Sequence, residues 1–198
     1  MSTVSFMFAL LAASIVVGYL RGGRLSNLLD LRLRWLPVAL VGFAIQEIPV
    51  RTTGPAVALL LTSFTILFVF GVANLRAPGI PLLCIGLLMN FAVIAANSGM
   101  PVPRDAVIAS GQAETIPALE HSTVKHHLAG PDDVLMPLAD VIALGAPIHL
   151  LFSPGDLAAF AGMSWLVMSG MRRRYRPRHL LARRFQLIKH PAALADAV

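Results

Sequence analysis

Apolar residues along the chain gather into five long runs separated by short polar or Gly-Pro segments. The runs occupy residues 3–20, 36–50, 56–75, 80–97 and 154–171. A helix needs about 20 apolar residues to cross some 30 Å of hydrocarbon, and four of the runs approach or reach that length. The second run is short and ends in polar residues. The pattern predicts five transmembrane helices.

The start of the last helix is the best defined in the sequence. Ser153 precedes Pro154, and Asp156 stands three residues after the serine. This is the spacing of an N-cap residue, a proline in the first turn and a capping-box acid. Ala158 and Gly162 form a small-xxx-small pair of the kind that allows close helix packing in membranes.

Polar chemistry concentrates in the segment between the fourth and fifth helices. Residues 100–156 hold four of the six histidines and seven of the ten acidic residues. Within this segment, residues 134–152 form an apolar stretch broken by Pro137, Asp140, Gly145 and Pro147. A sixth crossing there would place the two arginine blocks on opposite membrane faces, so we expect a re-entrant or interface-lying segment.

These elements predict an all-α integral membrane protein with about five transmembrane helices. A long, partly re-entrant extracytoplasmic loop joins helices four and five. The membrane bundle covers residues 1–174 and includes the outer loop 98–153, and a basic cytoplasmic tail covers residues 175–198.

Composition and charge distribution set the environment of the bundle. Hydrophobic residues make up 57% and charged residues only 13% of the chain, too few to cover a water-facing surface. The net charge is +6, but the basic residues flank apolar runs, which argues against nucleic acid as a partner. An extracellular N-terminus and a cytoplasmic C-terminus place 13 of 16 basic residues in the cytoplasm, as the positive-inside rule requires in a plasma membrane.

The expected partners follow from the same distribution. The bundle contacts the lipid bilayer, and anionic lipid is expected at the basic blocks between Arg21 and Arg34 and between Arg172 and Lys189. A membrane-protein partner or a homo-oligomer is a further possibility. The single cysteine, Cys84, excludes an intrachain disulfide and a thiolate cluster.

Six polar residues are candidates for a site near the outer face: Asn90, Asn97, Lys125, His126, Asp140 and Asp156. The two asparagines share one helix face and suit interhelical hydrogen bonding. Asp140 lies in an apolar stretch and needs a partner, and we expect an ion pair with Lys125 or His126 that keeps its carboxylate charged and holds the loop on the bundle. Histidine spacing favours neither a metal site nor haem, and we expect no cofactor.

Several short motifs recur in an order that resembles a known family. They are Arg21-Gly-Gly-Arg24, Leu31-Arg-Leu-Arg34, Met100-Pro-Val102, Lys125-His126, Asp140-Val-Ile142 and Phe152-Ser-Pro-Gly-Asp156. Together they resemble the bacterial integral-membrane domain-of-unknown-function family numbered 5317. The resemblance implies a small multi-spanning plasma-membrane protein and brings no activity, cofactor or catalytic residue. Ala139 stands where the family has glycine before Asp-Val-Ile.

Three functional hypotheses remain open on the sequence. The first is a non-enzymatic accessory or scaffold subunit that binds another protein. The alternative is a module at the outer face that binds or transports a lipid-like ligand, a quinone or a metal ion. The third is an intramembrane enzyme using His126 and Asp140, although no nucleophile elbow, Walker or Rossmann pattern is present.

Overall fold

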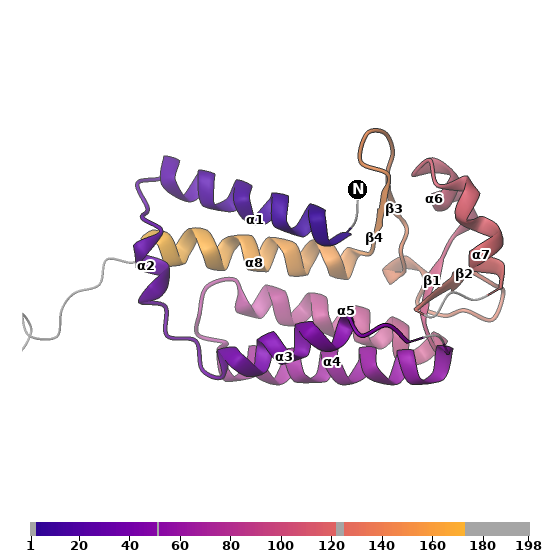
Figure 1. Cartoon of the computed structure of the whole chain (residues 1–198), viewed down its shortest axis with the longest axis horizontal. Helices are drawn as coiled ribbons and strands as arrows, with labels where there is room; N and C mark the ends of the chain where they lie inside the picture. Colours follow the sequence, from indigo (N-terminus) through magenta and orange to yellow (C-terminus); the bar gives the residue numbers. More distant parts are fainter. Residues whose placement is uncertain (1–2, 51, 122–124, 173–198) are drawn as a thin grey trace, which may run out of the picture.

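The computed structural model describes residues 3–50, 52–121 and 125–172, and most of them are helical. Five helices lie roughly side by side (Figure 1): α1 (Thr3–Leu20), α3 (Leu36–Gln46), α4 (Thr53–Ala73), α5 (Ile80–Asn97) and α8 (Pro154–Arg172). The short helix α2 (Ser26–Leu29) closes one end. We call this the basic end, because Arg21, Arg24, Arg32, Arg34, Arg76 and Arg172 lie in or beside its connections.

Helices α4 and α5 are long and apolar enough to cross a membrane, and the apolar parts of α1 and α3 are shorter. The helical class predicted from the sequence is therefore confirmed. The two long apolar helices are consistent with membrane association.

The order of packing follows from which apolar faces meet. Helix α5 packs against α8 on one side and α4 on the other, while α1 covers α8 and α3 covers α4. The main core lies between α4 and α5 and contains buried residues such as Phe64, Leu67, Ile80, Leu87 and Val93. Helices α5 and α8 run antiparallel and carry the functional site at the end away from α2 (Figure 1).

Glycines set the close approach of α5 and α8. A Cβ atom added to Gly162 would lie 2.5 Å from the Leu83 backbone nitrogen, and one added to Gly86 would lie 2.3 Å from the Gly155 carbonyl oxygen. Only glycine fits at such backbone contacts. The sequence singled out Gly162, and the structure confirms its close approach to α5; Gly155, two turns earlier on α8, makes the corresponding approach to Gly86.

Helix α3 is shorter than the apolar run predicted. It ends at Gln46, whereas the run continues to residue 50, and its 11 residues span only about 17 Å. Pro49 explains the early end, because proline disfavours helical geometry in the residue before it. The Gln46 amide donates to Ser63 Oγ over 2.8 Å, and that hydroxyl donates to the Gly42 carbonyl over 2.7 Å.

The segment between α5 and α8 is a folded cap rather than a simple loop. It contains a parallel pair, β1 (Met100–Val102) with β2 (His126–Leu128), and an antiparallel pair, β3 (Ile142–Leu144) with β4 (Leu150–Phe152). The remaining elements of this cap are α6 (Arg104–Ala109), η1 (Ala113–Thr115), α7 (Ile116–Glu120) and η2 (Met136–Leu138). The all-α prediction was therefore wrong for this segment.

The physical reason for these strands is the way the segment is interrupted. For β3 and β4 the interruption is Gly145 and Pro147, which prevent a continuous helix and leave two three-residue apolar pieces that pair as strands. Val102, Val107, Ile116 and Leu119 form a small core of their own inside the cap. The predicted basic tail, residues 175–198, lies outside the described residues.

Candidate functional site

A cluster of four hydrogen bonds among Asn90, Ser153 and Asp156, called the knot below, joins α5 to the start of α8. The Asn90 amide donates to Asp156 Oδ1 over 2.7 Å, and the Ser153 hydroxyl donates to Asn90 Oδ1 over 2.8 Å. Ser153 and Asp156 also form the predicted capping box: the Asp156 N–H donates to Ser153 Oγ over 2.9 Å, and the Ser153 N–H donates to Asp156 Oδ2 over 3.0 Å. Asn90 and Ser153 are buried, so these hydrogen bonds take the place of the bonds that the same groups make to water in the unfolded chain.

Asp140 lies buried in the cap beside this knot. Its Oδ2 is 3.6 Å from Nε2 of His126, and its N–H donates to the Pro101 carbonyl over 3.3 Å. Burial, together with the nearby negative charge of Asp156, raises the pKa of Asp140 to about 8. At neutral pH the fold therefore favours the neutral carboxylic acid, where the sequence led us to expect a carboxylate.

His126 is the neighbour that the sequence proposed for Asp140. Although about half of its side chain is exposed, desolvation by the surrounding cap lowers the pKa of His126. Lys125 and His127 lower it further, and the charge of Asp156 opposes them. With the imidazole and the carboxyl group both neutral, the 3.6 Å approach of His126 to Asp140 is a polar contact rather than an ion pair.

Lys125 has a different partner from the one expected. Its ammonium donates to the backbone carbonyl of Gln46, at the end of α3. The last carbonyls of a helix lack intrahelical donors, and a cation there also interacts favourably with the helix dipole. Lys125 thus links the cap to α3 and leaves Asp140 to His126.

Asn97 does not join the knot, although it shares a helix face with Asn90. Its amide donates to the Val93 and Val134 carbonyls over 2.9 Å, and its Oδ1 accepts from the Val134 N–H over 2.8 Å. Asn97 therefore holds the chain that leads into η2. Four of the six candidates form three attachments between cap and bundle, through Asn90 and Asp156 in the knot, through Lys125 and through Asn97. The other two, His126 and Asp140, meet within the cap.

Sequence reasoning missed a further pair inside the cap. Nε2 of His127 lies 2.9 Å from Asp133 Oδ1, and Asp133 Oδ2 accepts from the Gly130 N–H over 2.8 Å. Burial raises the pKa of Asp133, but the hydrogen bonds from Gly130 and His127 outweigh it and lower the pKa overall. The signal was present in the Gly130-Pro131 turn, which folds the chain back on His127.

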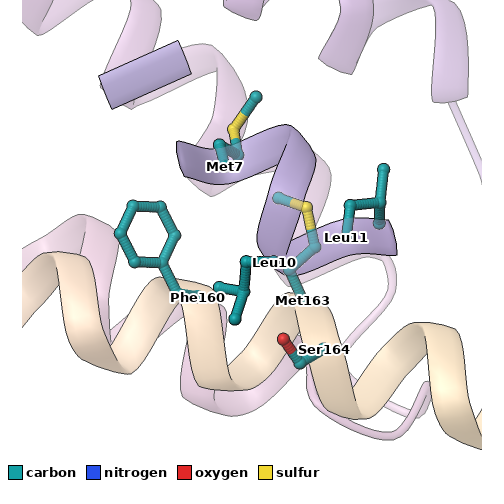
Figure 2. A pocket seen from close by; sticks show the side chains of 6 residues that line it. All are labelled: Met7, Leu10, Leu11, Phe160, Met163 and Ser164. Carbon is teal, nitrogen blue, oxygen red and sulfur yellow. The ribbon is translucent and has the colours of Figure 1, made fainter. Parts of the chain in front are cut away.

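Within residues 3–50, 52–121 and 125–172, no three His, Cys, Asp or Glu residues are placed to hold a metal ion. In the same ranges, every fully buried side-chain nitrogen or oxygen has a hydrogen-bond partner. A separate, small apolar pocket, with room for about one water molecule, lies between α1 and α8 (Figure 2). It is lined by Met7, Leu10, Leu11, Phe160, Met163 and Ser164.

These features define a mostly helical protein with apolar helices and a hydrogen-bonded cap. The chain belongs to the Family of unknown function (DUF5317), whose model matches residues 30–168. The match covers the chain from the α2–α3 connection through most of α8 and includes the whole cap. No curated protein and no solved structure matches the chain.

Proposed function

We propose that the chain is a plasma-membrane protein that crosses the bilayer five times, with the N-terminus outside and the cap on the outer face. Charge distribution in the described ranges supports this orientation. The basic end carries six arginines and one acid, Asp30. The opposite end carries eight acids against Arg104 and Lys125. Basic residues favour the cytoplasmic face, so α2 lies inside.

The short helix α3 is compatible with a crossing. Beyond Gln46, residues 47–50 continue without helix alongside α4 toward the cap end (Figure 1). Non-helical backbone at membrane depth is tolerated where protein groups satisfy it. Lys125 supplies such a group, because its ammonium donates to the Gln46 carbonyl.

The cap segment 134–152 lies at the outer membrane interface in this proposal. Val134, Leu135 and Val141 are exposed apolar side chains around η2. They suit contact with lipid, whereas the antiparallel β3–β4 pair satisfies the backbone beyond them. The partly re-entrant character expected from the sequence is thereby reduced to a shallow, interface-lying segment.

We further propose that the protein is a non-enzymatic accessory or scaffold subunit. The observation that supports this role is that the polar side chains of the candidate site bond within the protein. Asn90, Ser153 and Asp156 bond to one another, and Asn97 and Lys125 bond to backbone carbonyls. Such an arrangement holds a cap in place. Helix α3 also exposes Leu36, Val38, Leu40, Val41 and Phe43, an apolar surface available to a neighbouring membrane helix or to lipid.

Topology is tested by labelling single cysteines in a Cys84→Ala background. Arg24→Cys and Arg76→Cys should react with an impermeant maleimide only after the membrane is opened, and Asp105→Cys and Asp132→Cys should react in intact cells. Labelling of all four from one side would refute the five-crossing proposal.

The subunit role is tested by native mass spectrometry after gentle extraction. A stoichiometric protein complex or homo-oligomer that is lost in Leu40→Ser/Phe43→Ser would support it. Trp165→Ser, at an exposed apolar position on α8, is the control. A monomer without partner in mild detergent would contradict it.

The alternative, a binding module for a lipid-like ligand such as a quinone, has one observation in its favour. The pocket between α1 and α8 is apolar apart from the Ser164 hydroxyl (Figure 2). The pocket itself has room for only about one water molecule, so a lipid-like ligand would enter it by separating α1 from α8. A stoichiometric non-protein mass that disappears in Met163→Trp would favour this alternative over the subunit role.

A further inference from the structure

The corner between the α2–α3 connection and α3 is unusually well anchored at the basic end. The Asn74 side chain, at the end of α4, accepts from the Arg34 N–H over 2.8 Å and donates to the Arg34 carbonyl over 2.9 Å. Its amide also donates to the Phe70 carbonyl over 2.8 Å. Asn74 is buried, and all three bonds go to backbone groups. The amide thus holds the backbone of one exposed arginine in a single geometry.

The next residue, Trp35, has a strained backbone. Its φ of 60° lies in the left-handed region, which a bulky residue rarely adopts. Its side chain remains 53% exposed, so the strain is not repaid by burying the indole in this chain. The Arg34 guanidinium lies 5.8 Å from the Trp35 ring centroid, within cation–π range. Backbone strain that is kept at an exposed aromatic residue, next to an arginine whose backbone is held, motivates the hypothesis of a binding position.

The same corner concentrates positive charge without acidic partners. Arg76 follows Asn74 by two residues in the α4–α5 turn, and Arg34 is bound to Asn74. Both arginines are exposed, and neither takes part in the ion pairs found among the described residues. Exposed apolar side chains, Leu36 and Val38, continue from Trp35 along α3 toward the middle of the bundle.

We propose that Arg34, Trp35 and Arg76 form a binding site for the phosphate of an anionic phospholipid headgroup at the inner membrane face. This inference rests on the proposed orientation. The guanidinium groups bind the phosphate, the indole lies at headgroup depth, and the acyl chains follow the apolar side of α3. A soluble phosphate would use the arginines but gain nothing from Leu36 and Val38, which is why the structure favours a lipid.

The test measures lipids that stay bound to the full chain. The protein is placed in nanodiscs that contain equal amounts of phosphatidylglycerol and phosphatidylcholine. It is then released in the mass spectrometer, and the lipids that remain bound to it are identified and counted by native mass spectrometry. We expect one preferentially retained phosphatidylglycerol, and a roughly thirtyfold weaker preference in Arg34→Gln/Arg76→Gln, from the usual contribution of two arginines near a membrane surface. Arg21→Gln/Arg24→Gln removes the same charge from the same end and should keep the retained lipid.

Three results would overturn the site. Equal losses in the two double variants would mean a diffuse attraction to the whole basic end. Displacement of the retained lipid by millimolar inorganic phosphate would mean a free-anion site. No preference for phosphatidylglycerol in the parent protein would mean no site. Asn74→Leu provides a further check, because it keeps every arginine but frees the corner, and it should weaken the preference.

Failure of the site and failure of the proposed topology can be told apart. Cysteine labelling reports the orientation whatever lipid is bound. If labelling places Arg76 outside while the double variant still loses the lipid, the site stands and the orientation falls. If labelling agrees with the orientation and both double variants behave alike, the orientation stands and the site falls.

Discussion

Replacing Asp140 with asparagine should stabilise the protein at neutral pH, although it removes a carboxyl group from the polar site that the sequence predicted. The folded protein holds the Asp140 proton up to a pKa of about 8, whereas the ordinary value is 3.8. Between these values the unfolded chain releases a proton that the folded chain keeps. The contribution of Asp140 to stability is therefore complete below about pH 4 and is lost progressively as pH rises to about 8.

The magnitude follows from the width of that interval. From 3.8 to 7 is about three pH units, and each unit corresponds to about 1.4 kcal/mol, so ionisation of the unfolded chain weakens the fold by about 4 kcal/mol at pH 7. Asparagine has nearly the same shape, donates a hydrogen bond as the protonated acid does, and does not ionise. Asp140→Asn should equal the parent near pH 4 and exceed it increasingly toward pH 8.

The assay is the free energy of unfolding in detergent micelles at pH 4, 6, 7 and 8. Asp133→Asn is a matched control with the opposite sign. The pKa of Asp133 is lowered, so its carboxylate stabilises the fold above its ordinary pKa, and the variant should be less stable at neutral pH. If Asp140→Asn is less stable than the parent at pH 7, Asp140 is ionised and paired with His126, and the reasoning from burial is refuted.

Three further variants test how the cap and helices are held. Gly162→Leu should destabilise the bundle by about 3 kcal/mol or more, since a side chain there meets backbone of α5, while Gly54→Ala, with open space around it, should leave the melting temperature unchanged or slightly raised. Ser153→Ala should cost about 1 to 2 kcal/mol of unfolding free energy by removing the helix cap, whereas Thr62→Ala, which loses only an exposed bond within its own helix, should be nearly neutral. Lys125→Met should lower the free energy of unfolding by about 2 kcal/mol and increase amide hydrogen exchange at the end of α3. Unchanged exchange would show that the ammonium does not cap that helix.

Local signals in the sequence predicted much of the fold. The capping box at Ser153 and Asp156 forms as expected, because its spacing is set within one helical turn. The early end of α3 could also have been predicted from Pro49, a signal that the apolar pattern obscured. The strands of the cap could not, because three-residue pieces such as β1 and β2 carry no periodicity of their own.

The candidate site was only partly predictable. The sequence indicated which residues are polar in apolar surroundings, since such residues need partners in any fold. It did not indicate which partner each would find: Lys125 bonds to Gln46, 79 residues away, and Asn90 bonds to Asp156, 66 residues away. Asn90 and Asn97 share one helix face, yet Asn90 bonds to Asp156 and Asn97 to Val134, because the partner of each depends on how distant segments pack.

The sequence by itself determined that the protein is mostly helical, because hydrophobic patterning, helix length and capping depend on residues close together in the chain. Tertiary structure alone decided the protonation of Asp140 and the anchored corner at Arg34. Burial depends on what distant segments cover a group, and so a pKa follows from packing. The corner depends on Asn74, 40 residues away, whose amide reaches Arg34 only once α4 lies beside α3.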